Sequence, residues 1–326
     1  MKSFRTTVIP SKPEFQISHT DRLVSIGSCF SENIGEKLKE YKFNININPF
    51  GQQYNPYSVA NAINRLLNPV SYNENDLVYH DELYHSFDHH GSFSRSDQGE
   101  TLQGINENLL RASEDLKQAS ILFLTFGTSH VFRLKQTNAV VSNCHKLSVS
   151  FFNRTLMTPV EITEVLEKAL NDLRKVNDKI KVILTVSPVR YFAFGHYENS
   201  VSKAHLFTAI YELQRKYPEF YYFPAYELVM DDLRDYRFFA EDMLHPNHQA
   251  TNYVWEILSE TLLAKNTHQL LKEIDEILLA ARHRPRNPHS EAHKKFVRRA
   301  LEKIEKLKEQ LPEGFEREEE VLRNYI

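Results

Sequence analysis

The sequence predicts an α/β fold, a three-layer arrangement in which helices cover both faces of a parallel sheet, followed by a C-terminal α-helical hairpin. Between residues 22 and 262, short apolar runs typical of buried strands alternate with segments whose apolar residues recur at helical spacing. After about residue 265 only amphipathic helical patterns remain. We therefore expect an α/β domain over residues 1–264 and a helical hairpin over residues 265–326.

The elements of the α/β domain follow from these patterns in order. Apolar or alternating runs predict strands at 22–26, 42–47, 120–126, 181–186 and 220–223. Apolar stripes predict helices at 29–41, 56–67, 105–117, 159–173, 200–216 and 246–262. Thr158, Pro159 and Glu161 supply an N-cap, a first-turn proline and a capping carboxylate, and Pro56 opens the second helix.

Two irregular stretches interrupt this alternation. Residues 68–104 are rich in Asn, Asp, His, Ser and Tyr, which predicts a long excursion with short strands over one end of the sheet. Residues 131–134 and 139–141 are apolar and predict a small ribbon.

The C-terminal part contains two amphipathic patterns. The first stripe consists of Leu270, Leu271, Ile274, Ile277 and Leu278, and Pro285 and Pro288 follow it. The second stripe, at spacings of three and four typical of a coiled-coil seam, consists of Val297, Ala300, Ile304, Leu307 and Leu311. We expect the hairpin either to pack on the α/β domain or to form a homodimer through its helices.

Composition narrows the function classes. The 326 residues are 41% hydrophobic and carry a balanced net charge of −3, so we expect neither a nucleic-acid nor a membrane partner. Residues 1–15 lack the apolar segment of a signal peptide, and no apolar run approaches a membrane span. We therefore expect a cytoplasmic protein whose two cysteines, Cys29 and Cys144, are reduced.

Ser28 and Cys29 lie where the first predicted strand turns into the first helix. Parallel sheets bind ligands at the carboxyl ends of their strands, and a helix N-terminus lowers the pKa of a thiol. Either residue is therefore a candidate nucleophile. The structural alternatives are a helix N-cap for Ser28 and a small buried residue for Cys29.

Asp242 precedes His245 by three residues, just before the last predicted helix of the α/β domain. This spacing lets the carboxylate bond one imidazole nitrogen and leaves the other nitrogen to face a nucleophile. A turn or capping role for both residues is the alternative.

The segment Gly27-Ser28-Cys29-Phe30-Ser31 resembles the motif that names the GSCFA domain family, which is grouped with the SGNH (GDSL-like) hydrolases. Similar motifs follow in the same order at residues 125–128, 143–146, 185–190, 202–204, 222–227 and 241–246. The resemblance covers roughly residues 20 to 262 and implies an SGNH-like α/β/α sandwich.

The resemblance also implies roles for individual residues. Cys29 falls third in the Gly-x-Ser turn that carries the SGNH nucleophile, and Ser28 stands where Asp is usual. Gly51 resembles the glycine in the second sequence block of SGNH enzymes, which donates a backbone N–H to an oxyanion. The Gly-x-Asn motif of the third SGNH sequence block is not intact, because Ser129 stands in place of its Asn. Asn143 is the candidate that would replace this Asn as an oxyanion donor.

Arg190 ends the strand-end motif at 185–190 and is a second candidate for substrate binding. Its guanidinium is expected either to grip a carboxylate or phosphate on a substrate or to form an ordinary surface salt bridge.

The implied function is hydrolysis or transfer of an acyl group on a small-molecule or glycan ester, without a cofactor. His245 is the expected general base, Asp242 its orienting partner, and Cys29 or Ser28 the nucleophile. Because the Gly-x-Asn motif is altered and Ser28 is not at the third position of the Gly-x-Ser turn, the alternative is a non-catalytic ligand-binding module that retains the fold and the pocket.

The densest set of metal-ligand residue types lies in the irregular excursion and consists of His80, Asp81, His85, Asp88, His89 and His90. Their spacing matches no zinc pattern. We expect a polar lid whose histidines form hydrogen bonds and line the pocket, and no metal.

Overall fold

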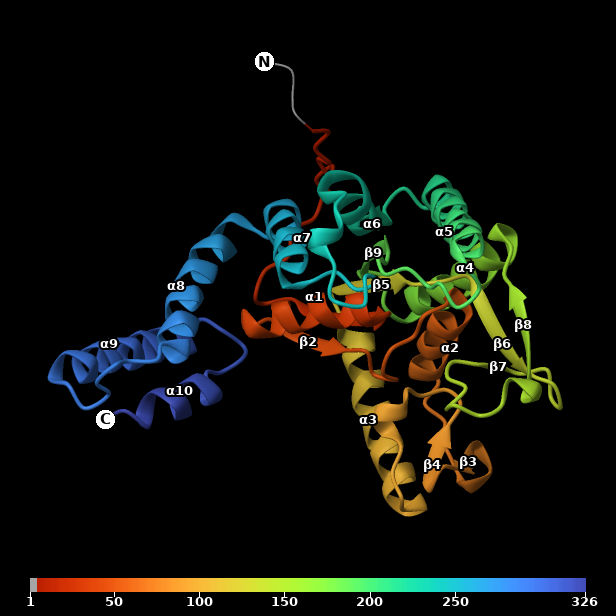
Figure 1. Cartoon of the computed structure of the whole chain (residues 1–326), viewed down its shortest axis with the longest axis horizontal. Coiled ribbons are helices and arrows are strands. Elements are labelled where there is room, and N and C mark those ends of the chain that lie inside the picture. Colours follow the sequence, from red (N-terminus) through yellow and green to blue (C-terminus); the bar gives the residue numbers. More distant parts are fainter. Residues whose placement is uncertain (1–4) are drawn as a thin grey trace.

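The computed structural model describes residues 5–326 and contains a five-stranded parallel sheet (Figure 1). In spatial order its strands are β10 (Tyr221–Tyr222), β9 (Lys181–Val186), β5 (Ile121–Phe126), β1 (Arg22–Gly27) and β2 (Asn44–Ile47). All neighbouring strands pair in parallel. The predicted α/β class with a central parallel sheet is confirmed. The chain order reverses between β1 and β5, and open parallel sheets bind ligands at such a reversal.

Helices cover both faces of this sheet. On one face lie α2 (Pro56–Leu67), α3 (Gln98–Gln118), α4 (Pro159–Val176) and α5 (His196–Lys216). On the other face lie α1 (Cys29–Glu40), α6 (Ala225–Glu227) and α7 (His248–Leu262). Because strand side chains alternate in direction, Leu122 and Leu124 of β5 pack on the first face and Phe123 on the second.

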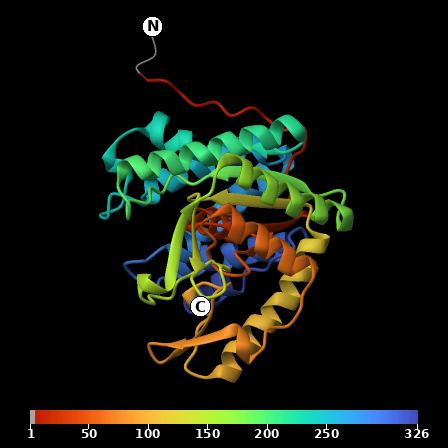
Figure 2. The same ribbon diagram turned by 90° about the vertical axis from the view of Figure 1, so that its right-hand side faces the viewer.

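The excursion between α2 and α3 carries an antiparallel hairpin of β3 (Leu77–His80) and β4 (Leu83–Ser86). Figures 1 and 2 both show this hairpin beside the N-terminal part of α3, away from the sheet. α3 begins at Gln98, earlier than expected, because its first turns are mostly polar and give no apolar stripe. Asp97 caps the helix by accepting a hydrogen bond from the Glu100 amide.

A second small sheet lies between β5 and α4 and consists of β6 (His130–Leu134), β7 (Val140–Val141) and β8 (Phe152–Leu156). The predicted ribbon corresponds to β6 and β7. β8 was not predicted, because its central residues Asn153, Arg154 and Thr155 are exposed and polar.

Both predicted C-terminal helices form and pack together, and a third helix that was not predicted follows them. These are α8 (Lys265–Arg282), α9 (Glu291–Lys308) and α10 (Glu316–Arg323). They pack around their own apolar cluster, to one side of the α/β domain (Figure 1). α10 gave no signal because Leu322 is its one buried apolar residue. The predicted boundary after residue 264 stays a prediction.

Contacts with the segment that follows α1 anchor these C-terminal helices. The Lys42 ammonium lies 2.8 Å from the Glu318 carboxylate and 4.7 Å from the centroid of the Phe315 ring. Lys42 and Glu318 are each 8% exposed. The Tyr41 hydroxyl donates to Asp275 at 2.6 Å. A buried ion pair therefore joins α10 to the residue that ends the turn after α1.

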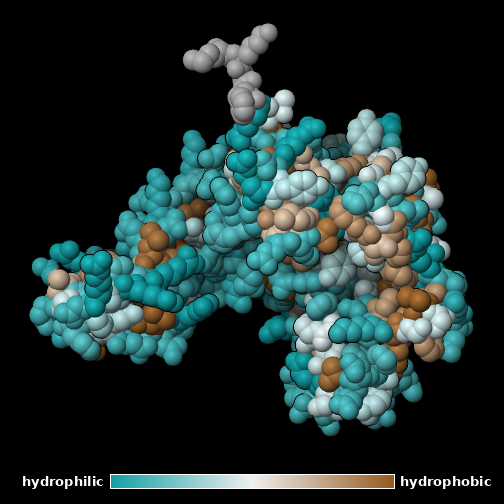
Figure 3. Space-filling model, in the orientation of Figure 1, coloured by the Kyte–Doolittle hydropathy of each residue, from teal (hydrophilic) through white to brown (hydrophobic). Residues whose placement is uncertain are grey.

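The surface in Figure 3 is mostly hydrophilic, with apolar residues gathered in small separate groups, one of them over the C-terminal helices. Leu279 of α8 is 66% exposed and Phe296 of α9 is 42% exposed. Within residues 5–326, no helix is long and apolar enough to cross a membrane. A homodimer through the C-terminal helices stays a prediction.

Replacing Glu318 by Ala tests the anchor. The change leaves the Lys42 ammonium buried without its carboxylate, and we expect it to weaken docking of the C-terminal helices by about 3 kcal/mol. Hydrogen exchange of α10 should become faster. Glu305→Ala, which removes an exposed partner of Lys308, is the control and should change little. Unchanged exchange of α10 in Glu318→Ala would show that the ion pair does not hold the helices in place.

Candidate functional site

The turn that carries both candidate nucleophiles lies at the reversal of strand order. Gly27 ends β1 and is paired with Thr125 of β5. A Cβ atom at Gly27 would lie 2.3 Å from the Thr125 carbonyl oxygen, so only glycine permits this approach. The Ser28 amide then donates to the same oxygen at 3.1 Å. Ser28 and Cys29 are thus fixed at the carboxyl end of the central strands.

Ser28 is the N-cap of α1. Its hydroxyl accepts a hydrogen bond from the Phe30 amide at 3.3 Å, and the residue is 1% exposed. Cys29 is the first residue of α1 and is partly exposed. Of the two candidates, the thiol is the more accessible group.

The net pKa shift of Cys29 is opposite to the shift expected at a helix N-terminus. Burial raises the pKa of the Cys29 thiol and outweighs the backbone N–H groups of Phe30 and Cys29, which lower it. The Glu32 carboxylate adds to the rise, and the Lys203 ammonium opposes it. The expected net lowering is therefore wrong, because the cost of desolvating a thiolate is larger than the gain from the helix.

Lys203 is a buried charge at this site that the sequence interpretation missed. It is 2% exposed, and its Nζ donates to the carbonyl oxygens of Gly127 at 2.7 Å and Ser187 at 2.6 Å. Burial lowers the pKa of Lys203 to about 7, and the Cys29 charge opposes that shift. Asn199 and Leu206 lie on the same buried stripe of α5, so helical spacing is a signal that could have revealed it.

Hydrogen bonds hold the loop after β5 to two other segments of the chain. The amides of Gly127 and Thr128 both donate to the Tyr54 carbonyl, at 2.8 and 2.9 Å. The hydroxyl of Ser129, which stands where the third-block Asn would be, donates to the Ser202 carbonyl at 3.1 Å. This loop is rigidly bound to α5 and to the segment around Tyr54.

Glu32, Gln52 and Tyr54 form a polar chain beside Cys29. The Tyr54 hydroxyl donates to the Gln52 side chain, which donates to the Glu32 carboxylate at 2.5 Å. Burial raises the pKa of Tyr54 to about 12, and the nearby charges of Cys29 and Glu32 add to the rise. Tyr54 is therefore a neutral hydrogen-bonding group at neutral pH.

Asp242 and His245 form the hydrogen bond that their spacing predicts. His245 Nδ1 lies 2.6 Å from Asp242 Oδ2, and both side chains are 45% exposed. The amides of His245 and Leu244 donate to Asp242 Oδ1, and with the imidazole they lower the pKa of Asp242 to about 2. The carboxylate thus stays ionised through the neutral range, and its stabilising effect is lost only as the pH falls below its ordinary value of 3.8 toward 2.

Arg190 holds the loop that carries this pair. Its guanidinium donates to the Met243 carbonyl at 2.7 Å, between Asp242 and His245 in the chain. It also lies over the rings of Phe192, Phe239 and Tyr236, at 5.0, 4.9 and 5.5 Å. Of its two expected roles, the surface salt bridge is not formed with any residue in the described part of the chain. Arg190 is placed instead to position the loop.

The two expected oxyanion donors are in tight turns. Gly51 has φ +71°, and its amide donates to the Asn48 carbonyl at 2.6 Å. Asn143 Oδ1 accepts from the His145 amide at 2.8 Å, which is the turn-capping alternative for this residue. No hydrogen bond among the described residues joins either of them to residues 28–30.

The histidines of the excursion are held in hydrogen bonds. His85 bonds the Ser94 hydroxyl at 2.7 Å and the His80 carbonyl at 2.9 Å, and His89 bonds the Ser86 hydroxyl at 2.9 Å. Burial lowers the pKa of His89 to about 3, which keeps its ring neutral. Within the described residues, no group of three or more His, Cys, Asp or Glu side chains is arranged to hold a metal ion.

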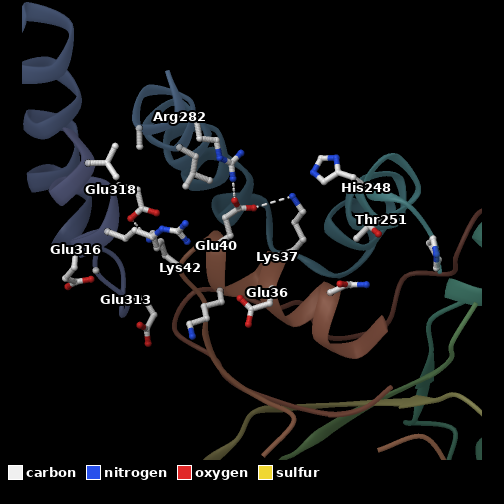
Figure 4. A pocket seen from close by; sticks show the side chains of 18 residues that line it. Glu36, Lys37, Glu40, Lys42, His248, Thr251, Arg282, Glu313, Glu316 and Glu318 are labelled. Carbon is white, nitrogen blue, oxygen red and sulfur yellow. Dashed lines mark hydrogen bonds and ion pairs between the residues drawn. The ribbon is translucent and has the colours of Figure 1, made fainter. Parts of the chain in front are cut away.

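A groove of about 820 Å³ lies between α1 and the C-terminal helices (Figure 4). Its lining is strongly charged, with Lys37, Glu40 and Arg282 in one cluster and Lys42 and Glu318 in another. Pro246 and His248, next to His245 in the chain, line it as well, whereas Ser28, Cys29 and Lys203 do not. This groove is separate from the nucleophile turn.

Two protein-family models together match most of this chain. The model of the GSCFA family matches residues 22–257, a range that contains Cys29, Lys203 and the Asp242–His245 pair. The model of the GSCFA domain protein, C-terminal domain, matches residues 274–325, which include α9 and α10. No curated protein matches the chain.

Replacing Arg190 by Met tests its role in holding the loop. The change removes the donor to the Met243 carbonyl and the charge among the three rings. We expect amide hydrogen exchange of residues 240–245 to become about tenfold faster, the change for a loss near 1.4 kcal/mol. Arg237→Met is the control, because Arg237 is exposed and pairs only locally with Asp235. Equal exchange in wild type and Arg190→Met would contradict the assigned role.

Proposed function

The chain belongs to the GSCFA family, and on that premise we propose that it is an SGNH-like acyl-ester hydrolase or acyltransferase. The observation that carries the proposal is the 2.6 Å bond between His245 Nδ1 and Asp242 Oδ2, which fixes the imidazole as in a nucleophile-His-Asp set. Within residues 5–326, no residue forms a hydrogen bond with His245 Nε2, so this nitrogen is available to act as a base.

The proposal includes the finer fold assignment, an SGNH-like three-layer sandwich. Three features support it: the nucleophile turn after β1, the helices on both faces of the sheet, and an Asp-x-x-His segment just before the last helix of the α/β domain. It also places Cys29 and His245 in one site, with the thiol as the preferred nucleophile.

The proposed reaction has two steps. His245 accepts the Cys29 proton, the thiolate attacks the acyl carbonyl, and the C–O bond breaks as His245 returns the proton to the leaving alcohol. Water, or an acceptor alcohol for transfer, then attacks the thioester while His245 takes its proton, and the thiol re-forms as the acid or new ester leaves. In this proposal the backbone N–H at the start of α1 stabilises the oxyanion. With Ser28 as the nucleophile, the same steps pass through an ester.

The substrate class is a small-molecule or glycan ester, and the proposed reaction needs no cofactor. We also propose a cytoplasmic location, because both cysteines are free thiols and suit a reducing compartment.

A non-catalytic ligand-binding module is the second candidate. Two observations favour it: the Ser28 hydroxyl is engaged as an N-cap, and the Ser129 hydroxyl is engaged by α5. Burial that raises the pKa of Cys29 also favours an unreactive thiol.

Acyl-adduct trapping with Cys29→Ala and Ser28→Ala identifies the nucleophile. Cys29→Ala should abolish turnover and the adduct. Ser28→Ala should retain the adduct and lose about 1 kcal/mol of stability with the N-cap. Peptide mass spectrometry of wild type after treatment with ester and thioester probes should place the added mass on Cys29. An adduct on Ser28 would reverse the assignment, and no adduct on either residue of a folded protein would support the binding module.

The His245–Asp242 pair should behave as one unit in kinetics. His245→Ala should lower kcat/KM for any ester substrate by about 10³-fold or more, and adding Asp242→Ala should cost little further, because both changes remove the same oriented base. The measurement is kcat/KM for the two single variants and the double variant. Additive losses would indicate separate structural roles for the two residues.

A further inference from the structure

A buried lysine lies at the carboxyl ends of three neighbouring strands. Lys203 reaches from α5 to the carbonyl of Gly127, which follows β5, and to the carbonyl of Ser187, which follows β9. β5 also pairs with β1, which leads into Cys29. The ammonium is therefore enclosed within the same sheet edge as the candidate nucleophile.

Among the described residues, no carboxylate accepts a hydrogen bond from Lys203. Both of its hydrogen-bond acceptors are neutral backbone oxygens, and no ion pair involving Lys203 occurs among the described residues. A buried ammonium without a counter-ion is costly, so it should have a role when an anion forms nearby. The ionisable groups beside it are Cys29 and Tyr226, whose ring centroid lies 5.9 Å from Nζ.

We propose that Lys203 is a positioning residue that serves as the charge partner of the Cys29 thiolate. One proton leaves sulfur and one arrives at nitrogen, so that thiol plus amine becomes thiolate plus ammonium. No hydrogen bond joins the two side chains, so the proton passes through solvent or another base. The inference rests on the proposed function only in taking Cys29 as the nucleophile.

The mutual influence of the two groups agrees with this arrangement. Burial lowers the pKa of Lys203 to about 7 and raises the pKa of Cys29, and each charge partly reverses the shift of the other. Such a pair titrates as a unit. Glu32 raises the pKa of Cys29 and so opposes thiolate formation, while the Tyr54 phenol, with a pKa of about 12, stays neutral.

This coupling predicts a distinctive pH profile for alkylation of Cys29. Below pH 7 the thiolate–ammonium form increases tenfold per pH unit as the pair loses its first proton. Above about pH 7 that form and the thiol–amine form carry the same number of protons, so their ratio no longer depends on pH. The alkylation rate should therefore flatten above pH 7 and rise again only when the second proton leaves.

The experiment measures iodoacetamide alkylation of Cys29 from pH 5.5 to 10 in a Cys144→Ser background, where Cys29 is the only cysteine. Lys203→Met should remove the flattening and slow alkylation at pH 7 by about tenfold or more. Lys203→Gln, which keeps a donor for the backbone carbonyls, should give the same loss and replaces Lys203→Met if that variant does not fold. Lys216→Met, at the exposed end of α5, is the matched control and should retain the wild-type profile.

Three outcomes would overturn the proposal: a wild-type profile without flattening near pH 7, flattening that persists in a folded Lys203 variant, or flattening that disappears in His245→Asn. The last would assign the charge partner to His245. The alkylation profile needs no substrate, so it is independent of whether the chain hydrolyses esters. Ester turnover that depends on Cys29, together with an alkylation profile that does not flatten near pH 7, would contradict only the role of Lys203.

Discussion

The close approach of β1 and β5 at Gly27 is the constraint on which the candidate site depends. Without a side chain at this position, the Thr125 carbonyl can accept the Ser28 amide and so set the first turn of α1. The Gly27 amide donates to the Asn48 side chain, and its carbonyl accepts from the Gln53 amide. One glycine thereby joins the nucleophile turn, β5 and the loop after β2, so the position of Cys29 is set by backbone rather than by side-chain packing.

Burial and helix electrostatics act against each other at Cys29. The start of α1 offers N–H groups to a thiolate, yet the same enclosure removes the water that would solvate the charge. Burial therefore favours the neutral thiol. In the proposed reaction the thiolate is stabilised by charges that are already in place, since preorganised groups need not be recruited during the reaction. Lys203, whose charge lowers the pKa of Cys29, is such a group, and in the proposed function the Asp242–His245 pair is another.

Sequence patterns predicted the parts of this molecule whose signals are local. β5 and β9 are mostly apolar because nearly all of their residues are buried, and Thr158 and Glu161 form the expected capping box. β8 and α10 lacked a signal because few of their side chains are buried apolar groups. In the site, the Asp242–His245 bond follows from short spacing. Lys203 and Arg190 bond backbone carbonyls far away in the chain, and no side-chain pattern marks a carbonyl partner.

α1 connects two features that have been described separately. Its twelve residues span about 18 Å, with Cys29 at one end and the Tyr41–Lys42 segment just beyond the other. That segment holds Asp275 of α8 and Glu318 of α10. The Cys29 thiol and the contacts that anchor the C-terminal helices therefore lie at opposite ends of one helix. The C-terminal helices are thus attached, through Tyr41 and Lys42, to the same helix whose first residue is Cys29.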